Sequence, residues 1–146
     1  MSVFCADPQR VWAVGTDGLI LHTADGGVNW TRQQTDTKKT LLKVTFAGED
    51  GLIVGLDGVV LQSADGGANW EQRQLGFSGT LFDVYLNGSS AWAVGSTGHI
   101  FHSKDKGRTW HRQPTPIEDN LTSVFFIDPR HGWAGGDSRT ILRFTE

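Results

Sequence analysis

The sequence predicts an all-β protein made of repeated four-stranded sheets, and three observations predict it. First, Trp30, Trp70 and Trp110 follow one another at intervals of 40 residues. Second, short apolar runs alternate with turns rich in glycine and aspartate. Third, no stretch of helical length shows the roughly 3.6-residue apolar period of an amphipathic helix. Four-stranded units that repeat at about 40 residues are typical of β-propeller blades.

Each repeat unit contains four short strands in the same order. An apolar, β-branched run such as 42–46 comes first, and the second strand is "VWAVG", "GLIVG", "AWAVG" or "GWAGG". A two-residue turn ("TDG", "LDG" or "STG") leads to the third strand, because Asp-Gly and Thr-Gly supply the positive φ angles that tight hairpins need. The fourth strand is polar: "NWTRQQ", "NWEQRQ" or "TWHRQP".

Burial then predicts how the sheets pack. A single twisted sheet cannot cover both of its apolar faces, so we expect the sheets to stack face to face around an axis. Val44, Val84 and Val124 are predicted to lie between neighbouring blades. The whole chain, 1–146, reads as one propeller domain, with blades at 2–36, 40–76, 80–114 and 121–146.

The fourth unit has three strands and lacks the outer one, since it reaches only "ILRFTE". Four blades could close alone, but an open arc would expose an apolar face at each end. A symmetric homodimer would join two such arcs into an eight-bladed ring and bury both faces. We therefore expect half of a propeller ring, closed by a second copy of the chain.

The turn between the third and fourth strands carries the motif Ser/Thr-x-Asp-x-Gly-x-Asn/Thr-Trp. We expect the hydroxyl and carboxylate to accept hydrogen bonds from turn N–H groups, glycine to supply left-handed backbone, and the Trp ring to be buried beneath the turn. A calcium loop is the rival interpretation, but one carboxylate per turn is far short of the 6–8 oxygen ligands that Ca²⁺ takes. The predicted structural positions are Thr23, Asp25, Gly27, Trp30, Ser63, Asp65, Gly67, Trp70, Ser103, Asp105, Gly107 and Trp110.

This motif matches the Asp-box (BNR) repeat, and the wider pattern resembles the photosystem II stability/assembly factor-like family. That family's repeat runs roughly "GWAVGxxGxIxxTxDGGxTW", and the resemblance extends over every unit of the chain. It implies a propeller, usually of seven blades, that is not an enzyme; plant and cyanobacterial members help to assemble photosystem II. Sialidases and some glycosidases share the Asp box and differ more in the rest of the repeat.

Composition excludes several other classes of protein. The net charge of −3 is spread over both signs, so nothing indicates a nucleic-acid partner. No apolar run approaches the roughly 18 residues of a membrane span. The single Cys5 excludes an internal disulfide and a cysteine metal site, and we expect no metal and no cofactor. No signal peptide is visible, which favours the cytoplasm, or the periplasm or secretion if a leader has been removed.

Any binding site is predicted on the face opposite the Asp boxes. There the inter-blade loops 36–40, 76–80 and 114–120 vary most between units, and function tends to lie on such loops. We predict a non-enzymatic scaffold that binds a protein or peptide through this face. The alternative is a carbohydrate-binding or glycosidase/sialidase-like module that uses the same face. The candidate contacts are Lys38, Lys39, Phe77, Glu118 and Asp119.

Asp83 and Tyr85 are two further candidate ligand-binding residues. They alternate on one face of the first strand in the third unit, and a tyrosine beside an acid is one feature of a sialidase site. The rival interpretation pairs Asp83 with Lys43 of the neighbouring blade, because a buried charge needs a partner. The arginines are spread over outer strands and no G-x-S-x-G elbow occurs, so no catalytic residue is predicted.

Overall fold

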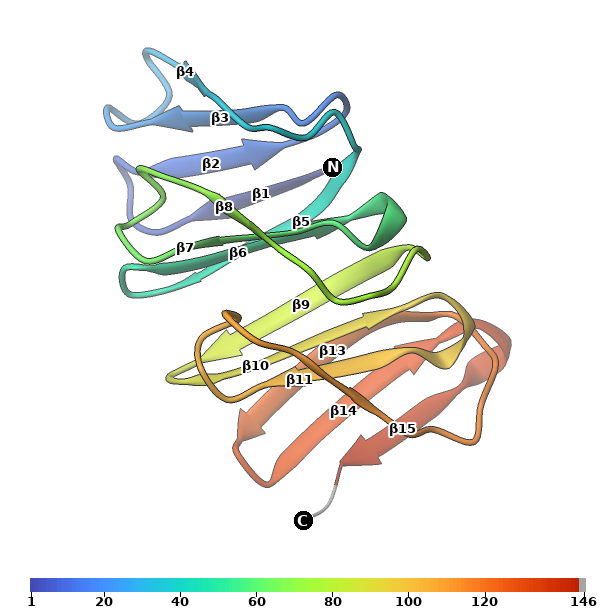
Figure 1. Ribbon diagram of the computed structural model, residues 1–146. Helices are drawn as coiled ribbons and strands as arrows, with labels where there is room; N and C mark the ends of the chain where they lie inside the picture. The colour runs from blue at the N-terminus through green and yellow to red at the C-terminus, as the bar shows by residue number, and fades with distance from the viewer. Residues whose placement is uncertain (145–146) are drawn as a thin grey trace.

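Four antiparallel sheets make up the protein, one for each predicted unit (Figure 1). The computed structural model describes residues 1–144, so the last two residues of the predicted fourth blade lie outside the described part. In every sheet the strands lie side by side in chain order. The strands are β1 (Ser2–Cys5), β2 (Val11–Val14), β3 (Ile20–Thr23) and β4 (Thr31–Gln33); β5 (Leu41–Ala47), β6 (Asp50–Gly55), β7 (Val60–Ser63) and β8 (Glu71–Arg73); β9 (Leu81–Asn87), β10 (Ser90–Gly95), β11 (Ile100–Ser103) and β12 (His111–Gln113); and β13 (Leu121–Asp128), β14 (His131–Gly136) and β15 (Ile141–Phe144).

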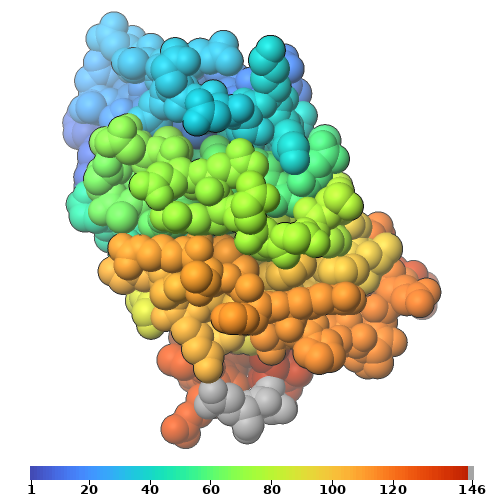
Figure 2. Space-filling view, in the orientation of Figure 1, coloured from blue at the N-terminus to red at the C-terminus, as the bar shows by residue number. Residues whose placement is uncertain are grey.

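The sheets stack face to face and form part of a β-propeller. Figure 1 shows the β1–β4 sheet at one end of the stack and the β13–β15 sheet at the other. In the space-filling view each sheet appears as a band, and the bands follow one another from the N-terminal to the C-terminal end (Figure 2). The predicted fold class, an all-β set of three four-stranded blades and one three-stranded blade, is confirmed.

Three apolar clusters lie between the sheets, one at each junction. Trp12 and Ile20 of the first sheet pack with Val44 and Leu61 of the second. Equivalent clusters join the second sheet to the third and the third to the fourth. The prediction that the alternate valines of the first strands lie between blades is confirmed, since Val44, Val84 and Val124 are all at most 5% exposed.

The turns between second and third strands follow the predicted chemistry. Asp17 and Gly18 both have positive φ, 54° and 64°, as do the equivalent residues of the second and third sheets. In the fourth sheet the same positions are held by Ser138 (φ 54°) and Arg139 (φ 66°), with no glycine. The turn geometry therefore repeats even where the sequence signal is missing.

The two end sheets each have an uncovered apolar face. On the first sheet, Val3 aligns with Val44, Val84 and Val124, and yet 63% of it is exposed. On the fourth sheet, Ile141 aligns with the buried Ile100 and is 75% exposed. Positions that the repeat buries elsewhere are thus open at both ends of the stack.

Candidate functional site

The three Asp boxes are closed networks of local hydrogen bonds. In the third box the Ser103 hydroxyl donates to Asp105 Oδ1 at 2.7 Å and accepts from the Gly107 N–H at 2.8 Å. The same carboxylate accepts from the backbone N–H and the hydroxyl of Thr109. The first and second boxes repeat this pattern around Thr23 and Ser63. The predicted structural role of the hydroxyl and the carboxylate is confirmed.

These hydrogen bonds hold the box carboxylates in the ionised form. Donation from the backbone and side-chain amides of Asn29 and from the Thr23 hydroxyl lowers the pKa of Asp25 to about 2. Donation from the Thr109 hydroxyl and backbone N–H and from Ser103 lowers the pKa of Asp105 to about 2. Each of these two carboxylates thus accepts its hydrogen bonds from residues of its own turn.

The box glycines lie over the core of the preceding sheet. A Cβ added to Gly67 would collide with the Trp12 ring and with Phe46, and one added to Gly107 would collide with Leu52. Each box of the second and third sheets therefore covers the edge of the junction between its own sheet and the sheet before it. The boxes serve packing between blades as well as turn formation.

The box tryptophans are less uniform than predicted. Trp70 packs on the first junction, and its Nε1 donates to Gln33 Oε1 of the first sheet at 3.0 Å. Trp110 is half-buried against the second junction. The prediction of burial is wrong for Trp30, which is 44% exposed, because no sheet of the described residues precedes the first one.

The inter-blade loops share one face with the turns between second and third strands. Backbone hydrogen bonds join the two sets, for example from Gly18 N to Lys39 O and from Gly98 N to Asp119 O. This network makes the loop face, defined here as loops 36–40, 76–80 and 114–120 with the adjacent turns, a fixed surface. The opposite face carries the Asp boxes, where Gly26 N donates to Gln9 O.

Lys38 and Lys39 lie together on the loop face. They line a groove of about 560 Å³ with Asp36 and Asp57, and Lys39 Nζ donates to Asp57 O at 3.0 Å. Lys38 also borders a neighbouring groove of about 320 Å³ beside Arg32. The predicted lysine pair thus lies at one groove of the first junction, together with two aspartates.

The other loop candidates lie elsewhere on that face. Glu118 lines a separate groove of about 610 Å³ with His99 and Arg112. Asp119 accepts a hydrogen bond from Oγ1 of Thr140, the residue that precedes β15. Phe77 stacks on the His99 ring at 4.5 Å and packs against the core, so its ring points into the molecule.

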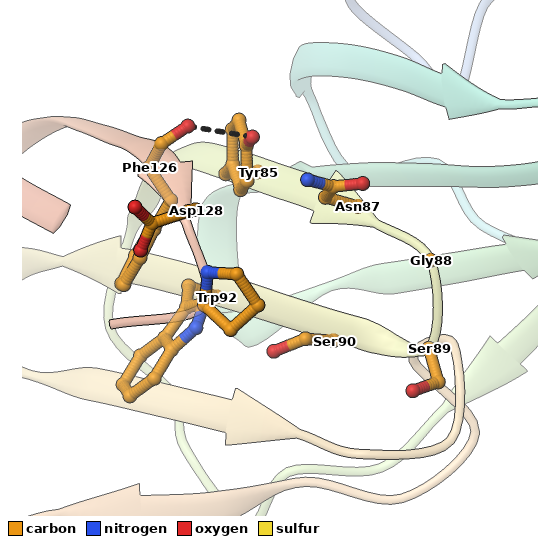
Figure 3. Close-up of a pocket in the computed structure, with 9 residues that line it drawn as sticks. Tyr85, Asn87, Gly88, Ser89, Ser90, Trp92, Phe126 and Asp128 are labelled. Atoms are coloured by element: carbon orange, nitrogen blue, oxygen red, sulfur yellow. Dashed lines mark hydrogen bonds between the residues drawn. The ribbon is translucent and has the colours of Figure 1, made fainter. Parts of the chain in front are cut away.

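Asp83 and Tyr85 lie between the third and fourth sheets. Asp83 is 8% exposed; its Oδ1 lies 3.2 Å from Lys43 Nζ, and its Oδ2 accepts from Val124 N at 2.9 Å. The predicted pairing of Asp83 with Lys43 is confirmed. Tyr85 Oη donates to Phe126 O at 2.7 Å (Figure 3). Both side chains therefore join neighbouring blades.

Sequence reasoning missed a cavity of about 370 Å³ on the Asp-box side of the third junction. Its lining includes Tyr85, Ser90, Trp92, Phe126 and Asp128, contributed by β9, β10 and β13 (Figure 3). Neither Trp92 nor Phe126 was predicted as a site residue. The signal that could have found them is Phe144, which stands where the other units have the hydroxyl residue of an Asp box, because the second and third boxes cover the equivalent places.

Among residues 1–144, no group of three or more His, Cys, Asp or Glu side chains could hold a metal ion. The same residues contain no helix with the length and apolar character that crossing a membrane requires.

Comparison with known proteins decides the family. The family model described as photosynthesis system II assembly factor YCF48 matches residues 1–80 and 76–145. The chain belongs to this family. The photosystem II assembly lipoprotein Ycf48 of Synechococcus sp. (strain CC9902) is 53% identical over 30 residues, which cover 20% of the chain and 9% of that relative.

Solved YCF48 structures share the fold along the whole chain. YCF48 bound to D1 peptide superposes with a TM-score of 0.78 at 23% identity, over 99% of this chain and 49% of that one. YCF48 from Cyanidioschyzon merolae also gives 0.78, at 20% identity, over 99% and 50%. The chain thus spans about half the length of these two proteins. An ancestral GH74 enzyme is more distant, with a TM-score of 0.69 at 13% identity over 97% of this chain and 25% of that one.

Proposed function

We propose that the chain is a noncatalytic scaffold that binds a protein or peptide through its loop face. The observation that carries the proposal is the complex of a solved YCF48 relative with D1 peptide, since 99% of this chain shares that relative's fold. Family membership supports a role in assembling photosystem II. A rigid scaffold that displays variable loops suits such binding.

The charges on the loop face favour an extended peptide that carries both signs. Lys38 and Lys39 offer cations at the first junction, and Glu118 offers an anion at the third. Because charges of opposite sign steer and align a partner, the peptide would place acidic groups near the lysines and basic groups near Glu118. Phe77 packs against the core and would hold loop 76–80 in place between these two sites.

The carbohydrate-active alternative is less well supported. Asp83, the acid considered for it, is held by Lys43 and the Val124 N–H. The likeness to the GH74 enzyme concerns the fold alone. A turnover screen on sialosides and other glycosides should therefore show no hydrolysis. Hydrolysis that Asp83→Asn abolishes would overturn the noncatalytic assignment.

We also propose that a second copy completes the ring. The uncovered face of the first sheet is equivalent to faces of the second and third sheets that are buried. The uncovered face of the fourth sheet is likewise equivalent to buried faces of the sheets before it. Packing the Val3 face of each copy on the Ile141 face of the other would use both surfaces with one two-fold operation. The expected assembly is a homodimer of eight blades.

For location, the relative named a lipoprotein favours the exported alternative, periplasmic or secreted, over the cytoplasm. We infer that the chain works outside the cytoplasm after removal of a leader. Detection of the native protein in cytoplasmic and exported fractions, with the N-terminus of the mature protein sequenced, tests this location. Recovery in the cytoplasmic fraction alone would contradict it.

Peptide titration tests the loop-face proposal. The D1 peptide is titrated into the protein by calorimetry, and we expect measurable binding. The double substitution Lys38→Ala and Lys39→Ala should weaken it about tenfold, because two partly exposed ion pairs are removed. Lys104→Ala is the matched control, since Lys104 is an exposed lysine on the Asp-box side. Equal weakening by the control, or no binding by the unmodified protein, would contradict the proposal.

A further inference from the structure

We propose that the cavity over Trp92 and the outer edge of β15 form a binding site for an extended, Asp-box-like segment of another polypeptide. The segment would add a fourth strand to the fourth sheet. This site lies on the Asp-box side and rim of the molecule, apart from the loop face, and does not depend on the proposed function.

The first junction shows how an Asp box fills such a place. Gly67 of the second box lies directly over Trp12 and Phe46, and the Trp70 ring stands edge-on to Phe46 at 5.6 Å. The repeat places Trp92 where Trp12 stands and Phe126 where Phe46 stands. Both line the 370 Å³ cavity (Figure 3). The cavity at the third junction is therefore the place that a fourth box would cover.

A hydrogen-bonding side chain is also in place. At the first junction Gln33 donates from Nε2 to Gly67 O at 2.5 Å and accepts from Trp70 Nε1 at 3.0 Å. Gln113 is the equivalent residue of the third sheet, and its Nε2 donates to His111 O at 3.3 Å instead. Gln113 lines a second hollow of about 260 Å³, which Trp92 and Phe144 also border. Its side-chain amide could donate a hydrogen bond to a glycine carbonyl of the bound segment and accept one from the indole N–H of its tryptophan.

The edge of β15 offers backbone pairing. One side of β15 pairs with β14, and no strand within residues 1–144 pairs with its other side. In the other three sheets that position belongs to β4, β8 or β12. An exposed strand edge of this kind is a ready template for strand addition.

The sequence of β15 lacks the residue that begins an Asp-box turn. Phe144 occupies the position of the box hydroxyl residues Thr23, Ser63 and Ser103, and it packs on Trp92 at 4.8 Å and Phe126 at 5.1 Å. Phenylalanine cannot make the hydroxyl bonds that close an Asp-box turn. Residue 144 therefore does not begin an Asp-box hairpin like those of the other sheets, which favours a strand supplied by a separate polypeptide.

The charge of Arg143 predicts one residue of the bound segment. Arg143 is exposed, and it aligns with Gln62, whose cross-strand neighbour is Glu71. An acidic residue at that position of the added strand would pair with Arg143. The site therefore favours a segment with a glycine over Trp92, a tryptophan beside Gln113 and an acid opposite Arg143.

A synthetic peptide tests the site. The probe is SADGGANWEQRQ, the sequence of residues 63–74, which carries all three features. Titration into the full chain should give saturable binding below about 1 mM, and hydrogen exchange at residues 141–144 should slow. Leucine in place of the second glycine of the probe should abolish binding, and lysine in place of its glutamate should weaken it about tenfold.

Protein variants locate the bound peptide. Gln113→Ala should weaken binding about tenfold, whereas Gln72→Ala, an exposed glutamine of β8, should leave it unchanged. The double substitution Lys38→Ala and Lys39→Ala should also leave it unchanged. No binding at about 1 mM, binding that tolerates the leucine, or loss of binding in the lysine variant would overturn the proposal.

Discussion

At the scale of single residues, one hydroxyl organises each Asp box. Ser103 has none of its surface exposed, and it links Asp105 to the N–H of Gly107. These contacts could be predicted from sequence, because hydroxyl, carboxylate and glycine act within a few positions of one another. The exposure of Trp30 could not be predicted in this way, because the burial of a ring depends on the neighbouring sheet.

Removing that hydroxyl should destabilise the protein. Ser103→Ala leaves the buried Gly107 N–H without its acceptor, so the free energy of unfolding should fall by about 1–3 kcal/mol. Urea denaturation measures the change. Ser78→Ala, at an exposed loop position, is the control and should have little effect. Equal stability of the two variants would contradict this role.

The carboxylates of the Asp boxes predict a dependence of stability on pH. The pKa values of Asp25 and Asp105 are about 2, below the ordinary 3.8. A lowered folded-state pKa stabilises the fold above pH 3.8, and this contribution is lost as pH falls toward 2. Urea unfolding between pH 5 and pH 2 should therefore show a steep loss of stability over this range. Asp25→Asn combined with Asp105→Asn should flatten it, and an unchanged profile would contradict the assignment.

At the scale of elements, each box of the second and third sheets closes the junction with the preceding sheet. The strand order and the Asp-Gly turns follow from local patterns, and the sequence predicts both. The cavity beside Trp92 arises between two sheets, so no local pattern indicates it. The turn at Ser138 and Arg139 is also set by its surroundings, since neither residue favours positive φ.

A pair of glycine substitutions separates backbone strain from steric collision. Gly76 and Gly107 both have positive φ, but a Cβ on Gly76 meets nothing within 4 Å, whereas one on Gly107 collides with Leu52. Gly76→Ala should cost about 1 kcal/mol of stability. Gly107→Ala should cost a further 1–3 kcal/mol or so, because it overpacks the junction. If urea denaturation gave equal losses of unfolding free energy for the two variants, close packing of the third box on Leu52 would be contradicted.

At the scale of the whole molecule, four sheets form an arc with two uncovered apolar ends. The number and order of the blades were predictable, since they follow from the 40-residue period. What covers the ends is not encoded in that period, because every unit presents the same kind of face. The pairing of the Val3 face with the Ile141 face of a second copy is therefore an inference from packing.

The mass of the particle in solution shows whether a second copy closes the ring. Light scattering should give about twice 16.0 kDa for the unmodified chain. Ile141→Asp should reduce the particle to a monomer, because it places a charge on the joined face, whereas Val28→Asp, at an exposed position on an Asp-box turn, should leave the dimer intact. A single species of 16.0 kDa for the unmodified chain at every concentration would exclude closure of the ring by a second copy.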